Sequence, residues 1–301
     1  MKKVFAVILN WNRLGDTLEC LESVRSLNTD GIDLNILVVD NGSTDDSTEK
    51  LKSIKDIKLI SNKCNLGYAA GNNVGIRYAL ESGADYVIVL NNDTILEKNC
   101  FSGLVKTAED NQSLGALSPK IYFAKGYEFQ KNKYKERELG KVIWYAGGVI
   151  DWKNVYGNGR GVDEVDKDVS DKTTETDYAT GTCILLTKEA LKRVGMFDER
   201  YYMYYEDTDL SQRLKRGGFG VVYVPSANIW HKVAQSSGIG SDLNDYFITR
   251  NRMIFGIKYA STRTKLALIK ESIRLLVGGR KWQKIGIRDY YLGKFGKGSW
   301  K

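Results

Sequence analysis

The sequence predicts an α/β fold in which helices flank a mostly parallel central sheet, followed by a helical C-terminal tail. Strand and helix patterns alternate along the N-terminal half, which is typical of parallel sheets. Apolar residues make up 42% of the 301 residues and charged residues 27%, as in soluble globular proteins. No apolar run approaches the ~18 residues of a spanning helix. This length allows one large domain or two ordinary ones.

The N-terminal half begins with an apolar run, Val4–Leu9, that stops at the polar Asn10. No small-residue cleavage site follows, so we interpret the run as the first strand and not as a signal peptide. Further strands are expected at Asn35–Val39, Ile57–Ser61 and Tyr86–Leu90. The helices between these strands are expected at Leu14–Leu27, Ser47–Ile54 and Ala70–Glu81.

The second half is less regular. Residues 124–178 are rich in Lys, Glu, Asp, Gly and Tyr, and we interpret them as an inserted region with one extended segment, Val142–Ile150. Mobile parts are expected around Gly126–Glu138 and Asp163–Lys172. Beyond the insertion we expect strands at Tyr178–Leu186, Val221–Val224 and Ile229–Lys232, and helices at Lys188–Arg193 and Thr208–Arg216.

The excess positive charge lies in the tail. Residues 258–301 carry twelve Lys or Arg against two acids, whereas the other 257 residues carry 33 basic and 35 acidic side chains. A body without net positive charge argues against a nucleic-acid partner. Four scattered cysteines without a CxxC pair argue against a zinc ribbon or a disulfide framework and indicate a reducing cytoplasm. These are Cys20, Cys64, Cys100 and Cys183.

An apolar stripe in the tail leaves two interpretations open. Leu266, Ile269, Ile273 and Leu276 fall on one face of a helix. In the first interpretation, the tail binds the anionic inner face of the cell membrane through basic and aromatic residues. In the second, the helix packs on the body or on a second subunit, as in a homodimer. The residues expected at a membrane are Lys265, Lys270, Arg274, Arg280, Lys281, Trp282, Tyr290, Tyr291 and Trp300.

Polar residues follow three of the predicted strands. The first strand ends at Asn10, the second at Asp40–Ser43 and the fourth at Asn91–Asp93. Because ligands bind at the carboxyl ends of parallel strands, these residues predict one ligand cleft. The alternative for Asp40 is a turn with a helix cap. The segment NLGYAAGNNVG adds small residues before a helix, which would let a diphosphate or sugar approach the helix N-terminus.

The segment YYMYYEDTDL holds the densest group of carboxylates, Glu206, Asp207 and Asp209. Packed carboxylates repel each other, so at least one should have a perturbed pKa or a cationic partner, and one could act as a general base. The alternative is a helix start, where acids suit the dipole. His231 is the single histidine, and with Asp93 it could complete a Mg²⁺ or Mn²⁺ site built mostly from substrate oxygens.

These motifs, in this order, resemble glycosyltransferase family 2, the inverting nucleotide-sugar transferases with the Rossmann-like GT-A fold. The resemblance covers roughly residues 3–235 and rests on VILNWNR, VVDNGSTDDS, NLGYAAGNN, LNNDT, YATGTCILL, the stretch from VGMFDER to KRGGF, and His231. The run VIWYAGGVIDW resembles rhamnosyltransferase-like bacterial members that build surface polysaccharides. The resemblance implies a GT-A domain at 1–240, with a nucleotide half at about 1–110 and an acceptor half at about 111–240, and a basic helical extension at 241–301.

The resemblance also implies roles for individual residues. Asp207 would be the catalytic base, and Asp93 with His231 would bind the metal. Thr180, Gly181, Thr182 and Glu206 would lie beside the donor sugar and the acceptor. The nucleotide and diphosphate would be bordered by Asn10, Asp40, Asn65, Gly67, Asn72 and Asn92.

Two departures from the family pattern matter. The acidic motif reads Asn91-Asn92-Asp93 and keeps only its last acid. Processive members of the family have a QxxRW motif, and this sequence has SQRLKRGG in its place. The missing QxxRW motif predicts transfer of one sugar per event. The expected reaction moves a sugar, best matched by rhamnose from dTDP-rhamnose, to a glycan or lipid-linked acceptor. The alternatives are a sugar-nucleotide nucleotidyltransferase and a non-catalytic carbohydrate-binding or scaffold protein.

Overall fold

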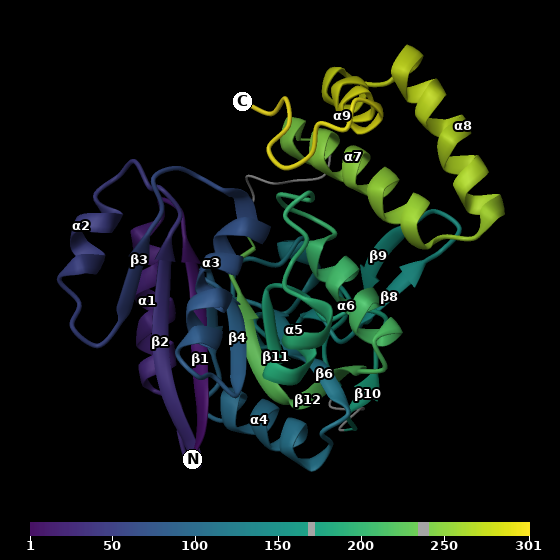
Figure 1. Cartoon of the computed structure of the whole chain (residues 1–301). Coiled ribbons are helices and arrows are strands. Elements are labelled where there is room, and N and C mark those ends of the chain that lie inside the picture. The colour runs from purple at the N-terminus through teal and green to yellow at the C-terminus, as the bar shows by residue number, and fades with distance from the viewer. Residues whose placement is uncertain (168–171, 234–240) are drawn as a thin grey trace.

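The computed structural model describes residues 1–167, 172–233 and 241–301, and within them ten strands form one mixed sheet (Figure 1). Their order is β10-β12-β6-β11-β4-β1-β2-β3, with β5 paired to β12 and β7 paired to β6. The strands of this sheet are β1 (Lys2–Asn10), β2 (Ile32–Asp40), β3 (Lys58–Ser61), β4 (Tyr86–Asn91), β5 (Thr94–Leu96), β6 (Leu114–Phe123), β7 (Ile143–Tyr145), β10 (Thr174–Glu175), β11 (Cys183–Thr187) and β12 (Gly220–His231).

The predicted parallel arrangement is confirmed for the N-terminal strands. β1 pairs in parallel with β2 and β4, and β2 pairs in parallel with β3. β6 and β12 are also parallel, while β11 runs antiparallel between β4 and β6. In register, Asn10 lies opposite Asp40 and Leu9 lies opposite Asn91. The polar ends of three strands therefore meet at one edge of the sheet.

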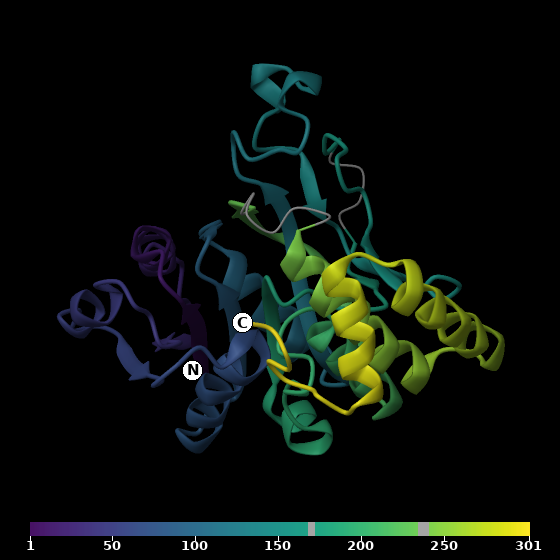
Figure 2. The same cartoon turned by 90° about the horizontal axis from the view of Figure 1, so that it is seen from above.

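Helices cover both faces of the sheet because side chains alternate along the strands. Val4, Ala6 and Ile8 of β1 pack with α1 and α4 on one face, and Phe5 and Val7 pack with α3, α5 and α6 on the other. Figure 2 shows the purple α1 and the blue α3 on opposite sides of the sheet. These helices are α1 (Leu14–Arg25), α2 (Ser47–Lys52), α3 (Gly67–Glu81), α4 (Cys100–Asp110), α5 (Lys188–Val194) and α6 (Glu206–Arg216).

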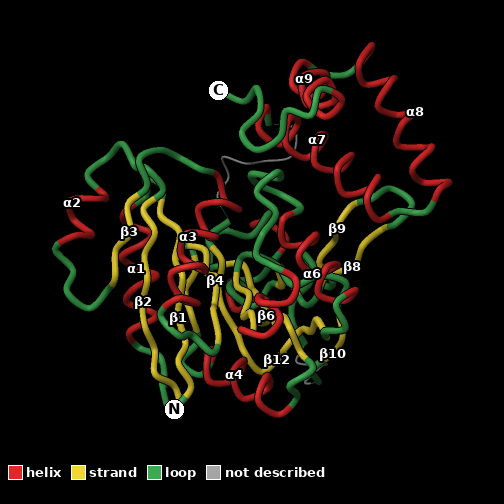
Figure 3. Tube along the Cα trace, viewed as in Figure 1, coloured by secondary structure: helices red, strands yellow, loops and turns green. Residues whose placement is uncertain are grey.

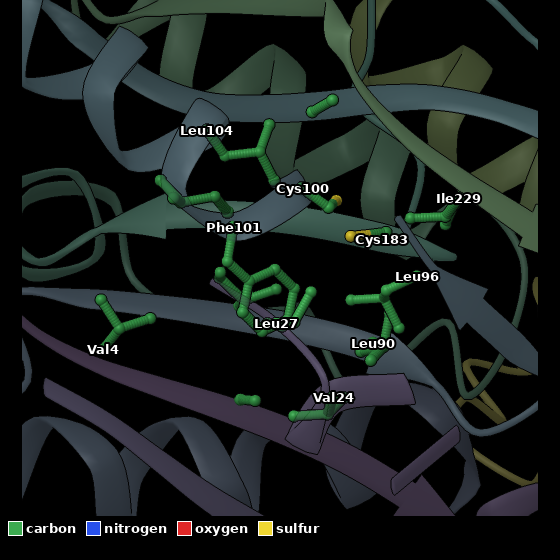
Figure 4. Packing of buried hydrophobic residues seen from close by; sticks show 14 of the residues in the cluster. Val4, Val24, Leu27, Leu90, Leu96, Cys100, Phe101, Leu104, Cys183 and Ile229 are labelled. Carbon is green, nitrogen blue, oxygen red and sulfur yellow. The ribbon is translucent and has the colours of Figure 1, made fainter. Parts of the chain in front are cut away.

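The first of these core layers is drawn in Figure 4. Val24 of α1 and Phe101 and Leu104 of α4 lie in the same apolar cluster as Leu90 of β4 and Cys183 of β11. All four cysteines are free thiols, and three of them are buried. Among the residues that the structure describes, no helix combines the length and apolar content needed to span a bilayer.

The tail forms a separate group of helices beside the sheet, α7 (Asp242–Tyr259), α8 (Thr262–Gly278) and α9 (Lys281–Tyr291) (Figure 3). α7 and α9 share an apolar cluster with Tyr201 and with Ile150 and Val155 of the small β8–β9 hairpin. That hairpin consists of β8 (Gly148–Asp151) and β9 (Tyr156–Gly159), which pair with each other. The inserted region also contains two short turns of 3-10 helix, η1 (Lys131–Lys133) and η2 (Glu136–Glu138). Residues 168–171, within one of its expected mobile parts, lie outside the described residues.

Two expectations for single elements were wrong, and two elements were missed. The extended segment Val142–Ile150 is two strands, β7 and β8, in different sheets, because the chain turns at Gly147 with φ +94°. The two strands expected at Val221–Val224 and Ile229–Lys232 are one strand, β12, with an irregularity in its pairing after Val224. α4 and β6 were not predicted, and β6 carries Pro119 at its centre.

The tail residues expected at a membrane divide into two groups. Trp282 is buried, and its ring lies 4.7 Å from the ring of Trp300, so both tryptophans pack within the protein. Arg280 forms an ion pair with the buried Asp245. Both tryptophan rings are therefore used in packing the tail, whereas the Arg280 side chain is 63% exposed, and a membrane contact of the tail stays a prediction.

Candidate active site

The carboxyl ends of β1 and β2 are joined by Asn10 and Asp40. Asn10 Nδ2 donates a 2.8 Å hydrogen bond to Asp40 Oδ1, and the hydroxyls of Ser43 and Thr48 donate to Oδ1 and Oδ2 at 2.5 Å. Asn10 and Asp40 are almost completely buried. Asp40 therefore holds the turn into α2, as the turn-and-cap interpretation expects, and its direct contact with a nucleotide stays a prediction.

A chain of hydrogen bonds extends this edge across the sheet to β4. Asn92 Nδ2 donates to Thr17 Oγ1 at 2.9 Å, and Thr17 Oγ1 donates to Asn10 Oδ1 at 2.7 Å. On the other side, the Asn91 amide donates to the carbonyl of Thr182 at 3.0 Å. The predicted residues at the ends of β1 and β4 and before β11 therefore lie side by side. Thr17 was not predicted as a site residue, because a single threonine on an amphipathic helix belongs to no motif.

The side chains of Asn41 and Asn65 form hydrogen bonds that hold the start of α3. Asn65 Oδ1 accepts hydrogen bonds from Asn41 Nδ2 at 3.0 Å and from the Gly67 amide at 2.8 Å. Gly67 has φ +83°, and a Cβ built there would lie 2.4 Å from the ring of Tyr202. The ring of Tyr202 therefore requires a glycine here, whether or not a diphosphate approaches the backbone. A place for Asn65 and Gly67 at the border of the nucleotide stays a prediction.

Asn72 points into the protein one turn further along α3. Its side chain is fully buried, Nδ2 donates to the carbonyl of Tyr68 at 3.0 Å, and Oδ1 has no hydrogen-bond partner among the described residues. Tyr68 in turn donates its hydroxyl to the carbonyl of Gly181 at 2.6 Å. A buried acceptor without a partner is costly, which makes Asn72 a candidate for binding a donor group from a ligand.

Asp93 and His231 are brought together from distant parts of the chain. β5 pairs with the end of β12 so that Thr94 lies opposite His231, and the Lys232 amide donates to the carbonyl of Asp93 at 2.8 Å. His231 Nε2 lies 3.2 Å from Asp93 Oδ1, but the two atoms are not aligned as a hydrogen bond. Asp93 Oδ1 and His231 Nδ1 have no other hydrogen-bond partner among the described residues.

This pair fits a divalent cation as two of its ligands. Neighbouring ligands of an octahedral ion at ~2.1 Å lie ~3 Å apart, close to the separation of the two side-chain atoms. Within the described part of the chain, no group of three or more His, Cys, Asp or Glu could hold a metal ion by itself. The remaining ligands would have to come from a substrate or from water, as expected for Mg²⁺ or Mn²⁺ bound with a diphosphate.

Asp207 lies at the start of α6, where two neighbouring segments hold its carboxylate. Oδ2 accepts a 2.9 Å hydrogen bond from the Gly181 amide, and Oδ1 accepts a 2.6 Å bond from the Thr208 amide. Burial raises the pKa of Asp207 above its ordinary value, and these hydrogen bonds oppose that shift. Thr180 and Thr182, on either side of Gly181, are largely buried. The structure thus connects Asp207 through Gly181 to the end of β4.

The three acids of the cluster have different surroundings, and the expectation that at least one of them has a cationic partner or a perturbed pKa is confirmed by Asp209. Asp209 is completely buried and forms ion pairs of 2.7 Å with Arg213 and Lys258. Glu206 is also buried, and its Oε2 has no hydrogen-bond partner among the described residues. Burial, with a smaller contribution from the charge of Asp207, raises the pKa of Glu206 well above its ordinary value. Asp209 is therefore structural, while the burial of Glu206 favours its protonated form.

A pocket of about 270 Å³ opens at Asp207 and Glu206. Thr180 contributes one polar side, and the ring of Trp144 meets the ring of His231 edge to face, with centroids 4.7 Å apart. The pocket is therefore next to the Asp93–His231 pair. Trp144 was not singled out from the sequence, although it lies within the quoted run VIWYAGGVIDW. The aromatic side chains that line the pocket are Trp144, Tyr156, Tyr178, Tyr204 and Tyr205.

The fold is shared with solved glycosyltransferase structures. The chain superposes on GalNAc-T7 bound to UDP, GalNAc and Mn²⁺ with a TM-score of 0.62 and 14% identity. The superposition covers 89% of this chain and 54% of GalNAc-T7. Over 96% of this chain and 74% of the other, the chain superposes on a mannosyltransferase of Pyrobaculum calidifontis bound to GDP-Man and Mn²⁺, with a TM-score of 0.56 and 14% identity. The fold is therefore GT-A, the fold class of these glycosyltransferase structures.

Sequence comparison narrows this class. Residues 5–195 match the family model described as glycosyl transferase family 2, and the chain belongs to this inverting family. It is 30% identical over 224 residues to the N-acetylglucosaminyl-diphospho-decaprenol L-rhamnosyltransferase of Mycobacterium tuberculosis, covering 68% of each chain. It is also 25% identical over 262 residues to a dTDP-rhamnosyl transferase of Shigella flexneri, covering 83% of this chain and 79% of the relative.

Proposed function

We propose that this glycosyltransferase transfers a single rhamnose from dTDP-rhamnose to a glycan or lipid-linked acceptor in the synthesis of a cell-surface polysaccharide. The observation that carries the proposal is the Asp207 carboxylate, which lines an aromatic pocket beside the Asp93–His231 pair. The names of the two rhamnosyltransferase relatives support the choice of donor and acceptor. The division into a GT-A domain at 1–240 and an extension at 241–301 belongs to the same proposal.

In the proposed reaction, Asp207 takes the proton of the acceptor hydroxyl as that oxygen attacks the anomeric carbon of the donor sugar. The carbon–oxygen bond to the diphosphate breaks on the opposite face, so one displacement inverts the configuration. The raised pKa of Asp207 makes its carboxylate a stronger base. The aromatic side chains of the pocket provide flat apolar surfaces against which a sugar ring can pack.

Asp93 and His231 would hold a Mg²⁺ or Mn²⁺ ion together with the donor diphosphate. A divalent cation at this position supplies charge stabilisation to the departing diphosphate. Asn72 and Asn92 would border the diphosphate and the ribose from α3 and from the end of β4, while Asn10, Asp40, Asn65 and Gly67 shape the nucleotide side. The proposed single transfer rests on the absence of a QxxRW motif at SQRLKRGG.

A lipid-linked acceptor would place the reaction at a bilayer. We therefore propose that the enzyme works in the cytoplasm, in peripheral contact with the inner face of the cell membrane. A homodimer is a second arrangement compatible with the tail, and it can be measured by light scattering on the purified chain.

A thermal-shift panel tests the donor. Nucleoside triphosphates, nucleoside diphosphates and nucleotide sugars are added with and without Mn²⁺, and a ligand that binds the folded chain raises its melting temperature. We expect selective stabilisation by dTDP-rhamnose that depends on Mn²⁺. Selective stabilisation by a nucleoside triphosphate would favour a nucleotidyltransferase instead. A stable donor complex that shows neither transfer nor hydrolysis would favour a carbohydrate-binding protein without catalysis.

A further inference from the structure

The helix α8 turns an apolar face away from the rest of the protein. Its buried residues, Thr264, Leu268 and Ser272, form the inner side of the helix. At ~100° per residue, the apolar stripe falls on the opposite side. Its members are exposed by 38% to 77%: Leu266, Ile269, Ile273, Leu276 and Val277. In Figure 1, α8 lies at the outer limit of the tail helices, which agrees with a face that none of the described elements covers.

Basic side chains border this face. At ~100° per residue, Arg263, Lys270 and Arg274 follow one edge of the stripe, and all three are exposed. The acid of α8, Glu271, lies toward the body, where it forms an ion pair with Arg252 at 2.8 Å. The outer side of α8 therefore combines apolar and positively charged groups.

We propose that this face of α8 is the surface by which the enzyme docks on an anionic lipid bilayer. An amphipathic helix with a basic border binds at the interface by burying its apolar side chains while its cations meet acidic headgroups. A second copy of the chain suits the face less well, because two α8 helices would bring their basic borders together without an outward acid to pair with them. The proposal deepens the proposed transfer to a lipid-linked acceptor and rests on it for its purpose.

The same surface is connected to the pocket at Asp207. Thr264, in the first turn of α8, donates its hydroxyl to the carbonyl of Trp152 at 3.1 Å, and Trp152 lies in the turn of the β8–β9 hairpin. Tyr156, at the start of β9, lines the pocket. One short hairpin therefore connects the proposed membrane face with the place where the acceptor hydroxyl would react. An acceptor anchored in the bilayer could reach Asp207 along this hairpin.

Co-sedimentation of the full chain with vesicles tests the proposal. The vesicles contain equal parts of phosphatidylglycerol and phosphatidylcholine, or phosphatidylcholine alone. We expect the wild-type chain to bind the anionic vesicles and to be released by salt, because each basic residue contributes about fivefold to binding at low salt. Leu266→Ser with Ile273→Ser should weaken binding at least about tenfold by removing buried apolar surface. Lys270→Gln with Arg274→Gln should weaken it by a similar factor.

Matched controls separate a local effect from a general one. Lys55→Gln with Lys106→Gln removes the same charge from exposed positions outside the tail, and Val162→Ser removes an exposed apolar side chain elsewhere. These variants should bind vesicles as the wild-type chain does. The melting temperature with and without dTDP-rhamnose is measured on every variant. An unchanged ligand shift in a chain that no longer binds vesicles shows that the fold and the donor site are intact, independently of any transferase activity.

Two results would overturn the proposal. The first is a wild-type chain that does not bind anionic vesicles, or α8 variants that bind them as well as the wild type does. The second is a wild-type dimer that the Leu266→Ser with Ile273→Ser variant converts to a monomer while vesicle binding stays unchanged, since the face would then belong to a second copy.

Discussion

Asn251 of α7 donates its side-chain amide to the backbone carbonyl of Tyr204 at 2.9 Å, two residues before α6 begins at Glu206. The same Nδ2 atom lies 2.9 Å from the carbonyl of Tyr201 and 2.7 Å from that of Met203. Tyr204 and Tyr205 have φ values of +66° and +74°, which non-glycine residues rarely adopt. A residue of the tail thus fixes the strained loop that leads into α6 and sets the position of Asp207.

Replacement of Asn251 should impair turnover more than donor binding. Asn251→Ala removes a donor from the carbonyls of Met203 and Tyr204, while the Tyr201 carbonyl still accepts from the Arg250 guanidinium at 3.0 Å, and we expect the loss to destabilise the fold by about 1–3 kcal/mol. At temperatures where the variant is folded, kcat should fall because Asp207 is less well positioned, while the donor-induced thermal shift remains. Asn35→Ala, on β2, is the control. An Asn251→Ala enzyme with wild-type kcat would show that the loop keeps its conformation without this contact.

The metal proposal predicts a shift in cation affinity. Asp93→Asn and His231→Gln each weaken or remove one of two protein ligands, so the Mn²⁺ concentration needed for half of the donor-induced thermal shift should rise at least about tenfold. Asp110→Asn, which changes an exposed acid at the end of α4, should leave that concentration unchanged. Equal Mn²⁺ titration curves for all four chains would contradict the proposed metal site.

Much of the fold and part of the site followed from the sequence because local patterns determine them. The apolar runs ending in Asn10, Asp40 and Asn91 became neighbouring parallel strands, so their polar ends had to meet. β6 escaped prediction for the opposite reason. Both of its faces are buried, so it lacks alternation, and a proline stands at its centre.

Contacts between segments far apart in the sequence could not be predicted. From the sequence, a glycine that is required by a nearby ring, such as Gly67 under Tyr202, cannot be distinguished from a glycine that leaves room for a ligand. Asn251 carries no signal because its partners are backbone carbonyls, which are the same at every residue. The sequence also could not predict that the apolar stripe of α8 faces outward, because a buried helix face and a membrane-binding helix face have the same apolar periodicity.

Glu206 predicts how the stability of the protein depends on pH. Its pKa in the folded state lies well above 4.5, so above pH 4.5 Glu206 retains its proton in the folded chain more than in the unfolded chain. The stability that protonated Glu206 contributes is complete below that value and is lost as the pH rises toward its folded-state pKa. Glu206→Gln cannot ionise. The melting temperature of Glu206→Gln minus that of the wild type should therefore increase between pH 5 and pH 8. If this difference is the same at every pH, the pKa of Glu206 is not raised in the folded state.

Close packing of α3 on the sheet predicts a cost at Gly75. A Cβ at this position would lie 2.3 Å from Cγ1 of Val7, a buried and branched side chain of β1. Gly75→Ala should therefore destabilise the protein by about 1–3 kcal/mol in chemical unfolding. At Gly103 in α4 the nearest atoms would be 3.9 Å away, so Gly103→Ala should instead stabilise the helix by up to about 1 kcal/mol. Similar effects of the two substitutions would contradict this account of the packing.

The central claim is that Asp207 removes the proton of the acceptor, and the turnover of Asp207→Asn tests it most directly. The variant keeps an oxygen that can accept from the Thr208 amide but lacks a base, so kcat should fall by about 10²–10⁴-fold while the Mn²⁺-dependent thermal shift by the donor is retained. Residual and wild-type products should both have the anomeric configuration opposite to that of the donor. Turnover within a few-fold of the wild-type rate would contradict the claim and assign the base to another residue.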